Sequence, residues 1–147
     1  MRVELTSIIP RNPEWVWERV KRSDTLHFIA HPLIRFRPKA GRFPEIWTEG
    51  EYEAGMSQFG VLPIGSQVIG IEYPQGEDGF VLRDNGRGTL IRLWDHWIFV
   101  EPDGQGGTRY TDRVDVKAGL LTPLIAGFAR IFYGHRQRRW QSLAKRD

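Results

Sequence analysis

The sequence predicts an α+β fold in which a curved antiparallel sheet of seven strands wraps around a long carboxyl-terminal helix. Six strand-like segments follow one another between residues 33 and 119, separated by short turns that contain glycine or proline. Connections this short join antiparallel neighbours, so these segments predict a meander. A further strand and two short helices precede them, and the last part of the chain changes to the period of a helix.

The amino-terminal elements are predicted from composition and caps. Residues 2–10 are rich in β-branched and apolar side chains and end at a proline, which is typical of a strand. Asn12 is a good helix cap and Pro13 suits a first helical turn, so a short helix follows. A second short helix is expected over residues 23–31, with Ser23 or Asp24 as its cap.

The meander is predicted from alternation and turn chemistry. The dipeptides Asn85-Gly86 and Asp103-Gly104 are strong hairpin signals, and a further turn is expected at residues 75–79. Residues 59–67 are expected to form a loop that carries apolar groups. The alternating glutamates of 49–53 indicate a solvated strand face. The predicted strands are 33–38, 45–57, 66–74, 79–86, 89–102 and 108–119.

The terminal helix is predicted over residues 122–143. Thr122 can cap it, and Pro123 fits its first turn. Side chains that recur at three- and four-residue steps mark the face expected to cover the sheet. They are Leu124, Ile125, Phe128, Ile131, Phe132, His135 and Arg139.

The composition of the chain excludes several kinds of functional site. The chain has 147 residues, a net charge of +3 and no cysteine, which excludes disulfides, thiolate metal sites and a cysteine nucleophile. We expect one domain over residues 1–147, located in the cytoplasm, since neither a secretory signal nor a run of ~20 apolar residues is present. The basic carboxyl-terminal tail could mark an interaction module, although cations near a helix end also complement its dipole.

Several segments resemble the START-like superfamily, also called SRPBCC or helix-grip, which includes the polyketide cyclase/dehydrase family. The opening "SIIPRNPEWVWERV" is similar to that family's first strand and helix, "WDHWIFVEPDGQGGTRYTDRVDV" to its penultimate hairpin, and "FARIFYGHRQRRWQSL" to its last helix. The resemblance implies a cavity between the sheet and the long helix that binds apolar or aromatic molecules. Some members are cyclases or hydrolases, so the resemblance leaves the activity open.

The hairpin around residues 103–107 carries the candidate site. Pairing Ile98 with Tyr110 places His96 opposite Asp112, and the alternation of the second arm predicts that these side chains point inward. A slip of one residue would instead turn Trp97 inward. If His96 and Asp112 meet, the carboxylate orients the imidazole, and the pair could act as a general acid and base. The alternative, which we favour, is that the two side chains form a polar pair whose hydrogen bonds satisfy each other and that does no chemistry.

The expected function is the binding of an apolar or aromatic small molecule that is lipid-like or polyketide-like. The alternatives are a cyclase/dehydratase-type enzyme that uses His96 and Asp112, and an interaction module that acts through the basic tail. His27 and His31 have the i, i+4 spacing of metal ligands, but Pro32 disfavours helix at His31, so no metal or other cofactor is predicted. Neither nucleic-acid binding nor stable membrane insertion is expected. The candidate ligand-binding residues are Tyr52, Phe59, Trp94, His96, Tyr110, Asp112, Phe128, Phe132 and Arg136, with Leu62 and Ile64 as candidates for the cavity mouth.

Overall fold

A computed structural model describes residues 1–75 and 79–146. In this part of the chain, seven strands form one antiparallel sheet in the order β1-β7-β6-β5-β4-β3-β2. The predicted fold class is therefore confirmed. The strands are β1 (Arg2–Ile9), β2 (Ile34–Pro38), β3 (Gly50–Gln58), β4 (Leu62–Glu72), β5 (Phe80–Gly88), β6 (Leu93–Pro102) and β7 (Thr108–Lys117). The helices are α1 (Pro13–Val20), α2 (Ser23–Ala30), the short η1 (Gly119–Leu121) and α3 (Thr122–Arg146).

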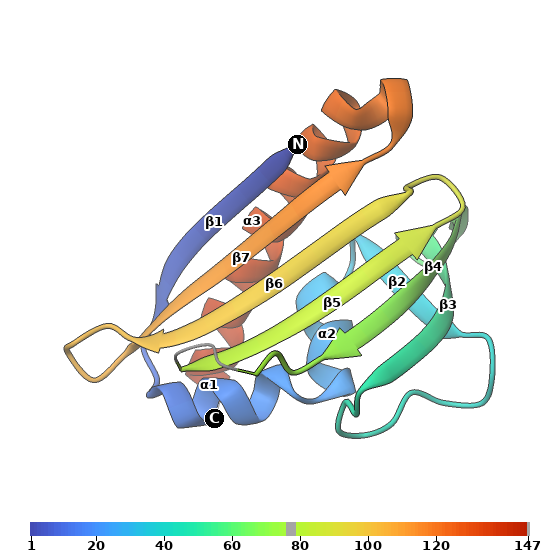
Figure 1. The fold of residues 1–147 in the computed structure, drawn as a ribbon. Helices are drawn as coiled ribbons and strands as arrows, with labels where there is room; N and C mark the ends of the chain where they lie inside the picture. Colours follow the sequence, from blue (N-terminus) through green and yellow to red (C-terminus); the bar gives the residue numbers. More distant parts are fainter. Residues whose placement is uncertain (76–78, 147) are drawn as a thin grey trace.

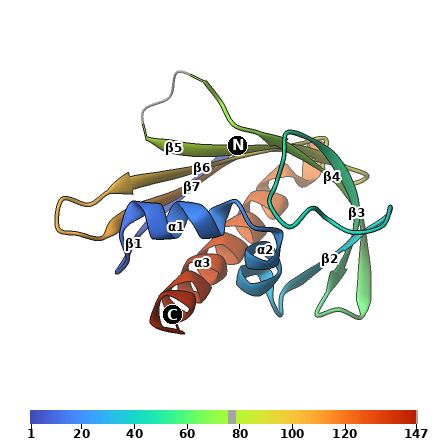
Figure 2. The same ribbon diagram turned by 90° about the horizontal axis from the view of Figure 1, so that it is seen from below.

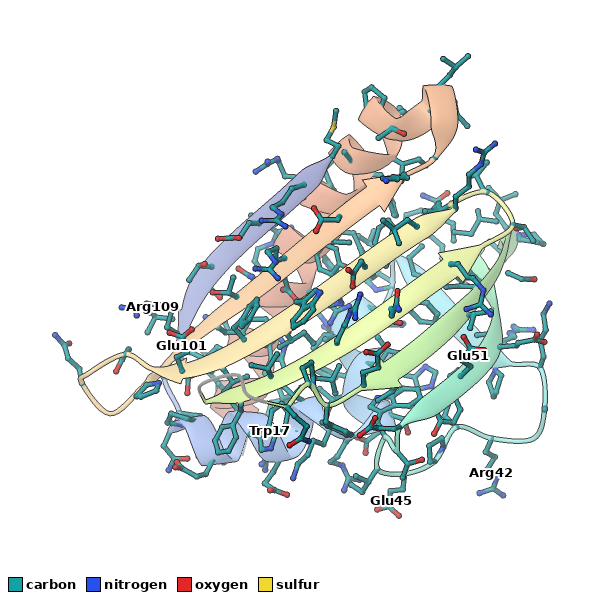
Figure 3. All side chains as sticks on the ribbon, viewed as in Figure 1. Trp17, Arg42, Glu45, Glu51, Glu101 and Arg109 are labelled. Carbon is teal, nitrogen blue, oxygen red and sulfur yellow. The ribbon has the colours of Figure 1, made fainter. Side chains whose placement is uncertain are left out.

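The helices lie on one side of the sheet (Figure 1). The long helix α3 runs along this side, and the view from below shows α1 between the carboxyl-terminal part of α3 and the sheet, with α2 beside α3 on the side of β2 (Figure 2). The opposite face of the sheet is turned away from α3; Glu101 and Arg109 lie side by side on it, near the tip of the β6–β7 hairpin (Figure 3). Over the described residues, no helix combines the length and apolar character that a membrane span requires.

Both amino-terminal helices form, and the first is capped as predicted. The Asn12 side chain accepts a hydrogen bond from the backbone N–H of Trp15 at 2.8 Å, and Pro13 opens α1. Val16 and Val20 are the buried residues of this helix. The second short helix also forms, but the predicted cap at Ser23 or Asp24 is wrong, because the N-cap residue is Arg22, which makes no side-chain capping bond. The helix ends where His31 adopts an extended conformation.

The inner face of α3 differs from the predicted face. Leu124 and Ile131 are 70% and 66% exposed, although the periodicity placed both on the covering face. Phe132 is buried as predicted, and Ile125 and Phe128 pack against the core, but most of the buried side chains were not predicted. Among them are alanines that allow the helix axis to approach the sheet closely. The buried residues are Ala126, Ala129, Phe132, Tyr133, Arg136, Gln137, Trp140 and Ala144.

Several predicted bounds also change. Strand β3 begins only at Gly50, because the segment before it packs against the helices and inserts Trp47, which is 5% exposed, into the core. The loop predicted at 59–67 shortens, since β4 already begins at Leu62, and α3 continues to Arg146 instead of ending near 143. The turn predicted at 75–79 falls mainly on residues 76–78, which lie outside the described residues.

The hairpin turn predicted at Asn85-Gly86 is wrong. Both residues lie inside β5, where Asn85 pairs with Asp95 and Gly86 with Trp94 of β6. Here β4 and β5 approach so closely that a Cβ built on Gly70 would lie 2.5 Å from the backbone oxygen of Asn85. The glycines of this region are thus used for close backbone approach within the sheet rather than for a turn.

We expect that Gly70→Ala lowers the free energy of unfolding by about 1–3 kcal/mol, because the new methyl group overlaps a backbone atom that cannot move alone. Gly55→Ala is the matched control in a neighbouring strand, since a Cβ there meets nothing within 4 Å. Equilibrium denaturation of both variants measures the difference. Equal stabilities would contradict the close approach of β4 and β5.

Candidate functional site

A cavity of about 680 Å³ lies between the sheet and α3. It exists because α3 packs on β1, β7 and α2, while the rest of the sheet curves away from the helix. Its wall is mainly apolar and comes from β2 to β6, α2 and α3. The lining residues are Leu26, Ile34, Phe36, Met56, Gln58, Ile64, Ser66, Gln67, Ile69, Asp84, Thr89, Leu90, Ile91, Trp94, His96, Pro123, Leu124, Ile125, Gly127, Phe128, Ile131, Phe132, Tyr133 and Arg136.

The β6–β7 hairpin differs in register from the prediction. Ile98 pairs with Asp112, and His96 pairs with Val114, so the predicted pairing was wrong by two residues. Because side chains alternate with a period of two, a shift of two leaves every residue on its predicted face. His96, Ile98 and Asp112 are accordingly buried.

A hydrogen-bonded pair links the two strands. His96 Nε2 lies 2.7 Å from Asp112 Oδ1, which is a diagonal contact across the hairpin. The same carboxylate accepts bonds from the Tyr110 hydroxyl at 3.3 Å and from Gln137 Nε2 at 3.1 Å. The His96 ring packs on Tyr133 of α3 with their centroids 4.6 Å apart. Asp112 is thus held by both strands and by the helix.

The environment fixes the charges of this pair. Burial lowers the pKa of His96 below its usual value, and the bond to Asp112 opposes this only in part. Burial acts to raise the pKa of Asp112, but the hydrogen bond from His96 and the charge of Arg136 outweigh it, so the net shift is downward. A neutral imidazole therefore donates its Nε2–H to a carboxylate. Its Nδ1 is then unprotonated, as a general base requires.

Arg136 brings a charge into the interior. Its side chain lines the cavity while the residue is only 5% exposed. The guanidinium lies over the rings of Phe132 and Tyr133, at 5.7 and 5.1 Å from their centroids. Burial acts to lower the pKa of Arg136, but Asp112 and the tyrosines outweigh this and raise it. Within the described part of the chain, Nε of Arg136 has no hydrogen-bond partner.

Asp84 is a cavity residue that the sequence reasoning missed. It is the cross-strand partner of His96 in the β5–β6 ladder, and its Oδ1 accepts a hydrogen bond from the Gly70 N–H at 2.9 Å. Burial in the cavity wall raises the pKa of Asp84 to about 7. Its alternation with Arg83, whose guanidinium binds Asp95 on the outer face, is the signal that could have placed it inside.

The cavity mouth carries exposed apolar side chains. Leu90, from the β5–β6 turn, and Leu124 and Ile131, from α3, line the cavity and are 52%, 70% and 66% exposed. Ile64 also lines the cavity, whereas Phe59 and Leu62, the other two residues expected near the mouth, are exposed outside it. Access from solvent is therefore along an apolar rim.

The structure brings together some of the candidate binding residues and separates others. Tyr52 does not line the cavity, because its hydroxyl is tied to Thr48 and its ring packs on Trp47. Tyr110 and Asp112 lie behind His96, in the supporting layer. Gln67 and Tyr133 line the cavity and were not predicted. The candidates that line the cavity are Trp94, His96, Phe128, Phe132 and Arg136.

Other polar features have internal partners. Arg139, in the basic tail, donates to the backbone oxygen of Phe28 and lies over its ring. His135 contacts the backbone oxygen of His31 at 2.8 Å, and the His27 ring packs on Phe43. Among the described residues, no group of three or more His, Cys, Asp or Glu side chains is arranged to hold a metal ion.

The raised pKa of Asp84 predicts a pH-dependent stability. The unfolded chain ionises this carboxyl near 3.8, whereas the folded protein holds the proton up to about 7, so its contribution to stability is lost across this range as the pH rises. Asp84→Asn should therefore raise the free energy of unfolding by up to about 4 kcal/mol near pH 8 and much less near pH 4.

Denaturation curves at both pH values measure this effect. Glu53→Gln, a change on the exposed outer face of β3, serves as the control and should leave stability nearly unchanged at either pH. A gain in Asp84→Asn that is the same at both pH values would show that the carboxyl ionises normally.

Solved structures share this architecture. A protein from Thermus thermophilus aligns with a TM-score of 0.71 at 13% identity, with 100% of both chains covered. A START superfamily protein from Mycobacterium smegmatis has a TM-score of 0.70 at 14% identity, covering 98% of this chain and 97% of the other. The Zhui aromatase/cyclase from Streptomyces sp. R1128 has 0.62 at 14% identity, covering 99% and 94%. The chain therefore has a START-like, helix-grip fold.

Sequence comparison assigns the family. A search of the curated proteins found no match. One family model, described as Domain of unknown function (DUF8410), matches residues 7–144, which is nearly the whole chain. The protein therefore belongs to the DUF8410 family.

Proposed function

We propose that this protein binds an apolar or aromatic small molecule, lipid-like or polyketide-like, in the cavity between the sheet and α3. The observation that carries the proposal is the cavity itself. Its volume of about 680 Å³ falls within the range of small-molecule sites, and its wall is mainly apolar with a few convergent polar groups. Transfer of an apolar ligand from water into this space is favoured by roughly 25 cal/mol for each Å² removed from water.

The proposed contacts divide into two kinds. Trp94, Phe128 and Phe132 offer aromatic surface, and Phe128 and Phe132 stack on each other with centroids 5.8 Å apart. Trp94 is anchored because its indole N–H donates to the Tyr133 hydroxyl at 2.8 Å, which supports a rigid wall. His96 and Arg136 supply polar contacts to the ligand. In this proposal Tyr110 and Asp112 act through His96 rather than by touching the ligand.

The second candidate is a cyclase/dehydratase-type enzyme that uses the same cavity. The observation in its favour is that His96 lines the cavity as a neutral imidazole, backed by an ionised Asp112 at 2.7 Å. Such a base could remove a proton next to a ligand carbonyl. Against it, Asp112 has further partners in Tyr110 and Gln137, which is what a structural polar network needs. We therefore place binding first.

Binding can be tested with an apolar, environment-sensitive dye. We expect saturable binding at both low and high salt, because apolar burial responds little to ionic screening. Ile64→Trp fills part of the cavity and should weaken binding about tenfold or more. Ile8→Trp, on the exposed end of β1, is the matched control and should bind like the unchanged protein. Dye titration by fluorescence measures both, and equal affinities in the two variants would contradict binding in the cavity.

Substitutions in the His96–Asp112 pair distinguish a binding protein from an enzyme. If the pair is structural, Asp112→Asn should clearly lower the melting temperature and leave dye affinity unchanged, because an amide keeps only part of the hydrogen bonding and removes the negative charge near buried Arg136. If the pair is catalytic, the same change should lower turnover by the ~10²–10⁴-fold typical of a lost acid or base. Thermal denaturation, dye titration and mass spectrometry of products from polycarbonyl compounds measure the three quantities. Conversion that is lost in Asp112→Asn and His96→Ala, at unchanged melting temperature, would favour the enzyme.

A further inference from the structure

We infer that the end of the molecule around the cavity mouth binds reversibly to the surface of an anionic lipid bilayer. The inference concerns a surface and its partner, so it goes beyond the proposed ligand binding and does not depend on it. It rests on exposed apolar side chains that gather at this end, on the cations beside them and on the lack of acidic residues in the segments that carry both.

Three connections lie at one end of the sheet. Because neighbouring strands are antiparallel, β3, β5 and β7 run in the same direction, so the β3–β4 turn, the β5–β6 turn and η1 with the first half of α3 follow at the same end. Figure 1 shows the β5–β6 turn and the start of α3 at the upper end of the sheet. Each connection, with the strand ends beside it, contributes to the wall of the cavity, so the mouth lies among them. The residues contributed are Gln58, Ile64, Thr89, Leu90, Pro123 and Leu124.

Exposed apolar side chains gather on these three connections. Eight of the eleven large apolar side chains that are exposed in the described part of the chain lie here, and Leu120 is fully exposed. Single apolar side chains are normal on a protein surface, but their concentration at one end indicates a site of interaction. The eight are Phe59, Val61, Leu62, Leu90, Leu120, Leu121, Leu124 and Ile131.

Three cations accompany these side chains. Arg92 closes the β5–β6 turn, Lys117 ends β7, and Arg130 precedes Ile131 on α3; all three are exposed. The Arg92 N–H donates to the backbone oxygen of Lys117 at 2.9 Å, so these two residues lie side by side. Within the described part of the chain, none of the three has an ion-pair partner. Their charges are therefore free to act on a partner molecule.

Acidic residues are missing from the sequence of these segments. No Asp or Glu occurs in residues 54–71, 85–94 or 116–146. Asp95 and Asp115, which border two of the segments, are each tied to an arginine on the outer face of the sheet. The end of the molecule around the mouth is therefore both apolar and positively charged, which is complementary to an anionic partner.

The composition of this surface favours a bilayer over a protein. Seven of its eight exposed apolar side chains are aliphatic, and they include neither Trp nor Tyr, which dominate the binding energy of protein interfaces. Aliphatic side chains flanked by Lys and Arg are typical of segments that lie in the head-group region of a membrane. A second copy of this chain is disfavoured, because a two-fold contact would bring the same cations together. Docking by this surface would turn the cavity mouth toward the bilayer.

Sedimentation with lipid vesicles tests the inference. We expect the protein to bind phosphatidylcholine vesicles that contain about 30% phosphatidylserine at least about tenfold more tightly than vesicles of phosphatidylcholine alone, because the cations are attracted to the anionic lipid. Binding to the anionic vesicles should fall several-fold between about 0.05 and 0.5 M salt, which screens that attraction. Equal binding to both kinds of vesicle would overturn the role of the cations.

Paired apolar variants locate the contact. Leu120→Ser with Leu121→Ser should weaken binding to the anionic vesicles about tenfold, because two exposed leucines no longer leave water for the bilayer. Neither residue lines the cavity. Ile8→Ser with Ile46→Ser is the matched control and should bind like the unchanged protein, since Ile8 lies near the far end of β1 and Ile46 lies beside the start of α2.

Paired charge variants separate the local cations from the net charge. Lys117→Gln with Arg130→Gln should weaken binding to the anionic vesicles about tenfold. Arg138→Gln with Lys145→Gln removes the same charge from exposed positions further along α3 and should weaken binding much less. Equal losses in the two double variants would show that binding does not use the surface around the mouth.

A fluorescent label reports whether this surface meets lipid. The chain has no cysteine, so Leu120→Cys can carry a single polarity-sensitive label. Its emission should shift to shorter wavelength when anionic vesicles are added, because the label leaves water for the head-group region. The same label on Ile8→Cys should show no shift.

Four results would overturn the inference. They are a lack of binding to anionic vesicles at low salt, binding without a shift of the label on Leu120→Cys, binding to poly-glutamate as tight as to the vesicles, and a dimer that Leu120→Ser with Leu121→Ser abolishes. The third would make an acidic protein the partner, and the fourth, measured by light scattering, a second copy of the chain. None of these measurements involves a ligand in the cavity, so the dye titration tests the proposed function separately.

Discussion

The buried carboxylate of Asp112 is the interaction on which the arrangement of sheet, helix and cavity depends. It accepts hydrogen bonds from His96 on β6, Tyr110 on β7 and Gln137 on α3. Gln137 also donates to the backbone oxygen of Leu5 at 2.8 Å, so the same network reaches β1. A buried charge is tolerated only when it is paired and hydrogen-bonded. Satisfying Asp112 therefore holds four elements in one relative position.

The attachment of α3 to one half of the sheet creates the cavity. Gln137 and Gln141 bind backbone oxygens of β1, and small side chains such as Ala126 and Ala129 allow close packing there. The strands on the other side curve away, and the space between is lined by larger apolar groups of both the sheet and the helix. Close packing at one edge and separation at the other thus arise from the same helix position.

The polar side chains of the cavity differ in how far protein partners already satisfy their hydrogen bonds. His96 is held by Asp112 and packed on Tyr133, so it is well positioned but already has a partner. Asp84 also lines the cavity, and within the described part of the chain the one hydrogen bond of its side chain is that which its Oδ1 accepts from the Gly70 N–H. Groups with unused capacity are the ones that can distinguish ligands, since a mismatched ligand leaves them unpaired.

The sequence by itself determined the fold class, the order of elements and the inward face of the β6–β7 hairpin, because periodicity, caps and turn residues act locally. Tertiary structure decided the rest. Asn85-Gly86 became part of a strand because close approach to β4 required glycine there. The buried face of α3 was set by where the helix attaches, which hydropathy does not encode when alanine, glutamine and arginine are the inward residues. The alternation of β5 indicates that Asp84 faces inward, but its position beside His96 was set by the pairing of β5 with β6, which the pattern of one strand does not reveal.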